Sequence, residues 1–143
     1  MLRHFTRIVF VLVLIASSHS CRNQNSIVPL VFVDVTLFLD LPEFAPLAAP
    51  GGSIHISGGS MGIIIYRRNM DEFVAFDRHC TYQVDEFCRI TIDEETAITA
   101  NCECCSSVFS IYDGTPISGE APAVLARYRT GYNGVTNQLR VFN

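Results

Sequence analysis

Apolar and polar residues alternate along residues 27–41, IVPLVFVDVTLFLDL. Every odd-numbered position from Val31 to Leu41 is apolar, whereas Asp34 and Asp40 fall on the opposite side. A period of two residues is that of a β-strand with one buried face. The pattern therefore predicts one long strand at this point of the chain.

Shorter apolar segments follow, separated by turn-forming residues. The strands that they predict are SIHIS, GIIIYRR, EFVAFD, CRITI, AITAN, VFSIY, AVLARYRT and NQLRVFN. The Asn133-Gly134 pair between the last two favours a tight hairpin turn, and the Pro/Gly-rich PEFAPLAAPGGS predicts a loop. No convincing helical stripe competes with these strands. The pattern therefore indicates a small, all-β, antiparallel sandwich or barrel.

Composition narrows the class of protein further. The 143 residues are enough for one domain, and 49% of them are apolar, which is enough to fill a core. All ten basic residues are arginines, against 14 acidic residues. This balance argues against a nucleic-acid partner, whose phosphates require a basic face.

The first residues resemble a secretory signal peptide. A basic start, MLRHFTR, precedes nine apolar residues, IVFVLVLIA, which are too few to cross a bilayer. Cys21 follows small residues and resembles the lipidated cysteine of a bacterial lipoprotein; simple secretion is the alternative. We expect residues 1–20 to be a signal peptide, 21–29 a lipidated tether and 30–143 the folded domain.

This leader predicts where the protein works. A lipid on Cys21 would anchor it to a membrane of the bacterial cell envelope, on the periplasmic or outer surface. Disulfides persist in such a compartment. Five cysteines follow Cys21, two in HCTYQVDEFC and three in CECCSS. Because five is odd, at least one sulfur stays free, binds metal or pairs with another molecule.

The chain from FDRHCTY onward resembles a Rieske iron–sulfur domain. That family carries C-x-H in one loop and C-x-x-H in a second; Cys80-Thr81-Tyr82 and Cys102-Glu103-Cys104-Cys105 occupy these places. CECCSSVF resembles CPCHGSxF, the Asp113-Gly114 turn matches, and GEAPAVLARY resembles GPAPxxLxxY. The resemblance covers about residues 60–143. It implies a Rieske-type antiparallel fold with two cysteine-bearing loops at one end.

The two histidine ligands of the family are replaced here, by Tyr82 and Cys105. His79 is a poor substitute, because in an extended chain its side chain points away from that of Cys80. His55 lies far upstream in a predicted strand and is read as structural or solvated. The proton-coupled, high-potential chemistry of the family is therefore not expected. Thiolate in place of imidazole favours the oxidised form, with a potential nearer to about −400 mV.

The resemblance implies one use of the sulfurs and leaves two others open. In the first, a [2Fe–2S] cluster is bound by Cys80, Cys102 and Cys105, with Tyr82 as a fourth ligand, and the domain transfers electrons to a redox protein partner. Some members of the family also carry a disulfide between the two loops.

Cys88 and Cys104 resemble that loop-linking pair, and Ser107 would donate a hydrogen bond toward a bridging sulfide. Oxygenases of this family need a second, catalytic iron domain, and this chain is too short to contain one. We therefore expect an electron carrier and not an enzyme.

In the second use there is no cluster, and disulfides Cys80–Cys102 and Cys88–Cys104 stabilise a binding or structural module at the cell envelope. In the third, Cys80, Cys88, Cys102 and Cys105 hold Zn²⁺. The C-x-x-C pair within CECC suits zinc, whereas the spacing of Cys80 and Cys88 is wider than usual.

Overall fold

The structure is a computed structural model that describes residues 27–143. The predicted signal peptide, the predicted lipidation site Cys21 and most of the tether lie outside the described residues. Within residues 27–143, no helix is both long and apolar enough to cross a membrane.

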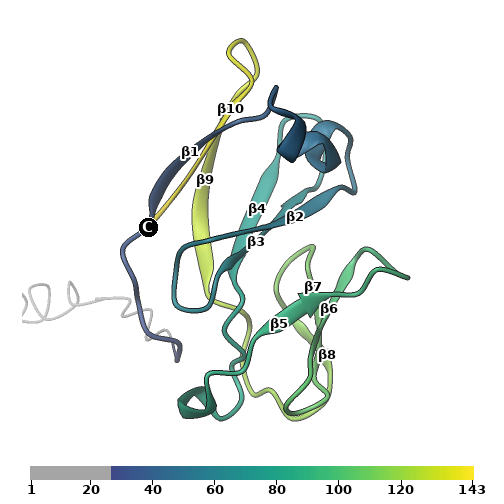
Figure 1. The fold of residues 1–143 in the computed structure, drawn as a ribbon. Coiled ribbons are helices and arrows are strands. Elements are labelled where there is room, and N and C mark those ends of the chain that lie inside the picture. Colours follow the sequence, from purple (N-terminus) through teal and green to yellow (C-terminus); the bar gives the residue numbers. More distant parts are fainter. Residues whose placement is uncertain (1–26) are drawn as a thin grey trace, which may run out of the picture.

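The described residues form two antiparallel sheets (Figure 1). The larger sheet has six strands in the order β1-β10-β9-β4-β3-β2. Its strands are β1 (Asp34–Phe38), β2 (Ser53–Ile56), β3 (Ile63–Arg67), β4 (Phe73–Asp77), β9 (Arg127–Asn133) and β10 (Gln138–Phe142). The all-β, antiparallel fold expected from the sequence is confirmed.

The smaller sheet is inserted in the chain between β4 and β9. Its four strands pair in the order β5-β6-β7-β8. They are β5 (Ile90–Ile92), β6 (Thr99–Cys102), β7 (Val108–Ser110) and β8 (Pro116–Ser118). Figure 1 shows this sheet beside one end of the larger one, at the end where β4 stops and β9 starts.

Strands β3 and β4 lie between two hydrophobic cores, and every residue of both strands is buried. Because side chains alternate across a strand, Ile63 and Ile65 enter one core and Ile64 and Tyr66 enter the other. The first, the large-sheet core, comprises Val33, Leu37, Leu39, Leu47, Ile63, Ile65, Phe73, Ala75, Tyr128, Leu139 and Val141. The second, the loop core, comprises Ile64, Tyr66, Val74, Phe76, Cys80, Cys88, Ile90, Ala100, Cys102, Phe109, Ile111, Ala121 and Leu125.

The first predicted strand is shorter than expected. Only Asp34–Phe38 pairs, along β10. The predicted alternation is confirmed from Val33 to Leu39, since Val33, Leu37 and Leu39 are buried, but Val31 and Leu41 at its two ends are exposed. The predicted loop after it contains a 3-10 helix, η2 (Pro42–Ala48), whose Leu47 is fully buried.

The hairpin of β9 and β10 forms as predicted, but its turn is wider than a tight two-residue turn. Asn133 pairs with Gln138, so residues 134–137 make the connection. Strand β8 had no sequence signal, because all three of its residues are exposed.

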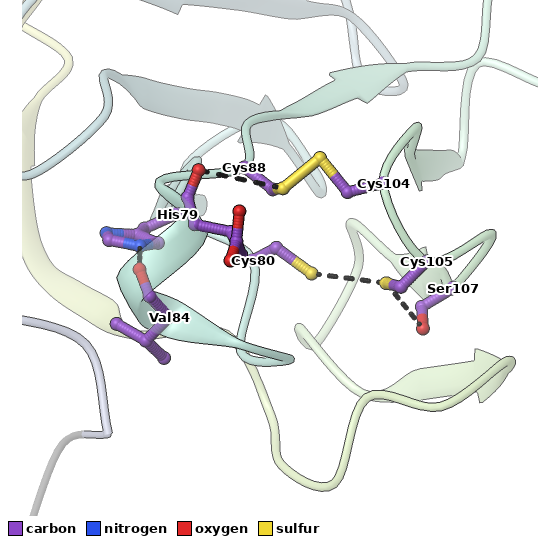
Figure 2. The surroundings of a disulfide bond; sticks show 8 residues. His79, Cys80, Val84, Cys88, Cys104, Cys105 and Ser107 are labelled. Carbon is purple, nitrogen blue, oxygen red and sulfur yellow. Dashed lines mark hydrogen bonds between the residues drawn. A yellow bond between two sulfur atoms is a disulfide. The ribbon is translucent and has the colours of Figure 1, made fainter.

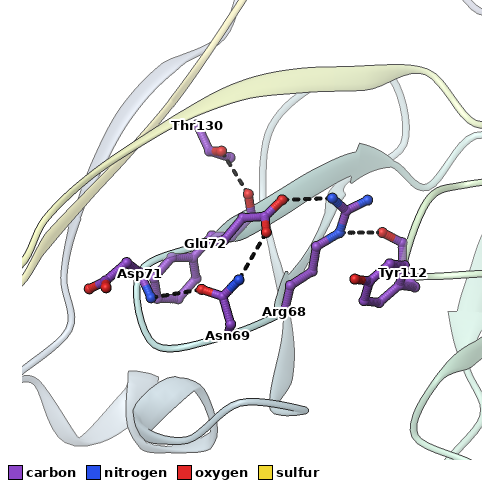
Figure 3. A network of polar contacts seen from close by, with 7 residues as sticks. Arg68, Asn69, Asp71, Glu72, Tyr112 and Thr130 are labelled. Atoms are coloured by element: carbon purple, nitrogen blue, oxygen red, sulfur yellow. Dashed lines mark hydrogen bonds and ion pairs between the residues drawn. The ribbon is translucent and has the colours of Figure 1, made fainter.

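Polar contacts of Arg68 join the two sheets near the β3–β4 turn (Figure 3). Its guanidinium forms a 2.7 Å ion pair with Glu72. Its Nε donates to the carbonyl of Tyr112, which follows β7, at 2.6 Å, and the guanidinium lies over the Tyr112 ring. The contact therefore fixes the smaller sheet against the larger one, although a partly exposed ion pair alone contributes little stability.

Candidate metal centre

Two loops at the same end of the fold carry Cys80, Cys88, Cys104 and Cys105, and Cys102 ends β6 directly before the second loop. The first loop, residues 78–89, connects β4 to β5 and holds a short 3-10 helix, η3 (Val84–Glu86). The second loop, residues 103–107, connects β6 to β7. Figure 2 shows that the cysteines of the two loops face one another.

Asp77, the last residue of β4, fixes the start of the first loop. Its fully buried carboxylate accepts hydrogen bonds from the backbone N–H groups of Ser60, Met61 and His79, at 2.6, 3.2 and 2.9 Å. The hydroxyl of Tyr128 donates a fourth, at 2.6 Å. A buried carboxylate with this many donors is satisfied without a counter-ion. Asp77 was not among the residues predicted at the site; its only signal in the sequence is one acidic residue at the end of the apolar run EFVAFD.

His79 has no nitrogen free for a metal. Its ring is fully buried, with Nδ1 2.8 Å from the hydroxyl of Ser60 and Nε2 2.8 Å from the carbonyl of Val84. His55 is exposed on β2. No imidazole is therefore offered to the loop ends by these two residues, as the sequence analysis expected.

A disulfide joins the two loops. Cys88 and Cys104 are bonded, with 6.1 Å between their Cα atoms (Figure 2). This is the pair that the resemblance implies. It also rules out the predicted Zn²⁺ site with Cys88 as a ligand, because a sulfur in a disulfide has no thiolate to give.

The other three cysteines of the described chain meet as free thiols. The Sγ atoms of Cys80, Cys102 and Cys105 all lie within 4.8 Å of one another, and those of Cys80 and Cys105 are 3.5 Å apart. Cys80 and Cys102 are buried and Cys105 is partly exposed. The Cys80–Cys102 bridge of the cluster-free alternative is not formed, because both residues are thiols and Cys105 brings its sulfur to the same point.

The surroundings raise the pKa of one of these thiols and lower the pKa of another. Burial raises the pKa of Cys80, and hydrogen bonding to Cys102 and Cys105 raises it further. Burial also opposes ionisation of Cys105, but hydrogen bonds from Ser107 and from the other two thiols outweigh it and lower its pKa. In the absence of metal, Cys105 therefore ionises before Cys80.

Ser107 is placed to hold the Cys105 sulfur. It is fully buried, and its Oγ lies 3.1 Å from Cys105 Sγ. The same Oγ accepts the backbone N–H of Ala121 at 2.9 Å, so the hydroxyl proton remains available for the thiolate. Ser107, predicted to donate toward a bridging sulfide, thus lies beside Cys105, whose thiol donates to the Ser107 Oγ while it keeps its proton.

A third segment, residues 119–125, lies against both loops. The hydroxyl of Thr81 donates to the carbonyl of Ala123 at 2.8 Å, and Ala121 and Leu125 belong to the loop core. Gly119 has φ +91°, and a Cβ there would lie 2.4 Å from the Cα of Ser107. Sequence reasoning matched this segment to a family motif but did not identify Gly119 as a packing position.

Tyr82, predicted as a fourth ligand, packs against the loop core and is half-buried. Hydrogen bonding to Glu120 and the charge of Glu120 raise the pKa of Tyr82. A phenol that keeps its proton is a poor metal ligand, so Glu120 opposes the role predicted for Tyr82. Glu120 carried no signal in the sequence.

The donor set fits an iron–sulfur centre bound by thiolates. Cysteine thiolates are the ligands of ordinary [2Fe–2S] clusters, and three of the four that such a cluster uses are present here. The mixed cysteine and histidine set of the Rieske family is not present at these positions. The chemistry that fits is therefore that of a thiolate-rich centre with three cysteine ligands.

Comparison with known proteins supports the fold. No protein family model and no curated protein sequence matches this chain. Among solved structures, a chain from the complex of reduced oxygenase and oxidized ferredoxin in carbazole 1,9a-dioxygenase is similar, with a TM-score of 0.50 and 18% identity; the match covers 80% of this chain and 94% of that one. The ferredoxin of carbazole 1,9a-dioxygenase from Nocardioides aromaticivorans IC177 gives 0.48 and 15%, over 78% and 97%.

At these identities the likeness concerns the fold alone. The protein has a fold of Rieske type, with two cysteine-bearing loops at one end, as the resemblance implied.

Proposed function

We propose that this domain binds an iron–sulfur cluster through Cys80, Cys102 and Cys105 and transfers electrons to a redox protein partner. The observation that carries this proposal is the convergence of three free Sγ atoms within 4.8 Å, contributed by both loops of a Rieske-type fold. A bound [2Fe–2S] cluster supplies one-electron chemistry. What the chain itself supplies is thiolates, burial and orientation.

Each residue of the site has a separate role in this proposal. Cys80 and Cys102 are buried, so their side of the site excludes water. Cys105 is partly exposed, which makes it the side from which a partner can approach. The Ser107 hydroxyl holds the Cys105 sulfur, and the Cys88–Cys104 disulfide prevents the two loops from separating.

We further propose that the protein works as a carrier and not as an enzyme, anchored through Cys21 at the cell envelope. The order of residues 1–21 supports this location, as argued above, and the acidic balance of the chain supports a protein partner over nucleic acid.

Metal analysis of the protein from iron-replete cells tests the proposal. We expect a coloured protein with two irons and two acid-labile sulfides per chain. Cys102→Ser removes one buried ligand and should lose most of the iron. His55→Gln, at the exposed position of β2, is the matched control and should keep the iron.

Two results would contradict the proposal. A colourless, iron-free wild-type protein would indicate that the thiols serve another purpose. One zinc ion per chain, without sulfide, would indicate a mononuclear site on the same three thiolates.

A further inference from the structure

The sulfurs of Cys80 and Cys105 are in contact, and no covalent bond joins them. Their Sγ atoms are 3.5 Å apart, and both residues are free thiols. Figure 2 shows the two side chains pointing toward each other from opposite loops, beside the Cys88–Cys104 bridge. A disulfide bond is about 2.05 Å long, so the two sulfurs would have to approach by about 1.5 Å to form a second bridge between the same two loops.

The three thiols differ in access from solvent. Cys80 and Cys102 are buried, whereas Cys105 is partly exposed. A dissolved disulfide therefore reaches Cys105 first. Backbone hydrogen bonds hold both buried cysteines, since the N–H of Cys102 donates to the carbonyl of Ser107 and the N–H of Cys80 to that of Cys88. The 3.5 Å contact between the Cys80 and Cys105 sulfurs therefore decides between them. Cys80, in contact with Cys105, is then the sulfur placed to complete the reaction.

We propose that Cys105 and Cys80 form a dithiol pair that reacts with disulfides, and that the bond formed between them excludes metal from the site. The second half of this inference rests on the proposed function, since it assumes that the three thiolates bind metal. The substrate class is a small disulfide, of which oxidised glutathione is the probe used below.

The reaction is a pair of thiol–disulfide exchanges. The Cys105 sulfur, as thiolate, attacks one sulfur of the small disulfide; a Cys105–glutathione bond forms and one glutathione leaves as the thiol. Cys80 then attacks the Cys105 sulfur; the bond from Cys105 to glutathione breaks, the proton of Cys80 passes to the departing sulfur, and the second glutathione leaves as the thiol. The two protein thiols are oxidised, one disulfide is reduced to two thiols, and no other oxidant is needed.

The number of thiols explains why this bond and a metal compete. Three thiolates are offered at the site, and a Cys80–Cys105 bond removes two of them. Cys102 alone is left. Reduction would restore all three, so the state of the pair would decide whether the site accepts metal.

The test uses the full chain with Cys21→Ser, so that only Cys80, Cys102 and Cys105 titrate as thiols. Metal-free protein is treated with oxidised glutathione, and thiols are counted after denaturation. We expect three thiols to fall to one. Cys102→Ser should fall from two to none. Cys105→Ser should keep both, apart from any glutathione adduct found by mass.

Peptide mapping of the oxidised protein without reductant assigns the bond independently of any variant. Cleavage after glutamate separates residues 73–86, 87–94, 96–103 and 104–120, which carry Cys80, Cys88, Cys102 and the Cys104-Cys105 pair. The proposal predicts one species of three linked peptides and a free 96–103 peptide. A 73–86 peptide linked to 96–103 would instead show a bond from Cys80 to Cys102 and overturn the proposal.

Metal uptake separates the failure of this proposal from that of the proposed function. Reduced protein should bind iron and oxidised protein at least tenfold less, with recovery after dithiothreitol. Reduced protein that binds no metal would overturn the proposed function and the competition with metal. If all three thiols persist in oxidised glutathione, Cys80 and Cys105 are not a dithiol pair. If the bridged protein binds as much iron as the reduced protein, the bond does not exclude metal from the site.

Discussion

The hydroxyl of Tyr128 lies 2.6 Å from the carboxylate of Asp77, although the two residues are 51 positions apart in the chain. Both side chains are buried, and they join β9 to the end of β4, directly before the first cysteine loop. Burial and the Asp77 carboxylate raise the pKa of Tyr128, so the phenol remains a hydrogen-bond donor. The start of the loop that carries Cys80 therefore depends on a hydrogen bond from Tyr128, a residue that follows the inserted sheet in the chain.

Tyr128→Phe tests this contact. The change removes one donor from a buried carboxylate and leaves the ring in place. We expect the free energy of unfolding to fall by about 1–3 kcal/mol, because the carboxylate loses a charge-assisted hydrogen bond. Urea denaturation followed by circular dichroism measures the effect.

Tyr132→Phe provides the matched control, since that half-buried hydroxyl donates to Asn137 near the surface. It should have the smaller effect. If the free energy of unfolding falls equally in the two variants, the hydrogen bond from Tyr128 to Asp77 stabilises the protein no more than a surface contact does.

Ser107→Ala should make Cys105 harder to ionise. Burial raises the pKa of the Cys105 thiol, but the hydrogen bond to the Ser107 hydroxyl lowers it. Alanine at position 107 removes that hydroxyl. A thiol with a lowered pKa is ionised, and therefore alkylated, at lower pH than an ordinary cysteine. We expect the midpoint of alkylation against pH to lie below that of a free cysteine in the wild type and to move upward in Ser107→Ala.

The rate of iodoacetamide labelling of metal-free protein, read by mass spectrometry of residues 104–120 across a pH series, provides this measurement. Ser118→Ala, on exposed β8, should leave the midpoint unchanged. If the midpoint does not move in Ser107→Ala, the Ser107 hydroxyl does not lower the pKa of Cys105.

Replacing Cys88 and Cys104 together by serine should destabilise the domain and the site. The bridge spans a sequence separation of 16 residues, for which the chain-entropy model gives about 3 kcal/mol. Without it the loops are joined only by weaker contacts, so iron retention should fall as well. Urea denaturation and iron content measure the two effects.

Cys105→Ser is the comparison for stability, since it removes a sulfur and keeps the bridge. Its unfolding free energy should fall less than that of the double variant. If the double variant unfolds at the wild-type urea concentration, the bridge is not what holds the loops together.

Much of the fold could be predicted from sequence because burial in this chain has a simple period. Val33, Leu37 and Leu39 alternate with exposed positions, and that alternation alone places β1. The pattern fails at Pro116–Ser118, because β8 is an exposed edge with no buried side chain to mark it. It also overestimates the first strand, whose length is set by pairing with β10 and not by composition.

The cysteines of the site could be predicted from the sequence, but most of the hydrogen bonds and packing contacts around them could not. The resemblance to the Rieske family implied both the two loops that carry Cys80 and Cys105 and the pairing of Cys88 with Cys104. The hydrogen bonds of Asp77 and the approach of Gly119 join segments that are distant in sequence. Such contacts depend on the packing of three separate segments, which no local pattern records.

Gly119→Ala tests the packing of the third segment against the sulfur site. Gly119 has φ +91°, where an L side chain is strained, and an added Cβ would lie 2.4 Å from the Cα of Ser107 and 2.6 Å from its Oγ. Backbone strain of this kind costs about 1–3 kcal/mol, before any displacement of Ser107. We expect lower stability in urea and faster loss of iron, because the donor to Cys105 is pushed from its position. Gly131→Ala is the matched control: a Cβ there meets nothing within 4 Å, so stability should change by less than about 1 kcal/mol and iron should be kept. If Gly119→Ala behaves like Gly131→Ala, residues 119–125 do not hold the sulfur site in place.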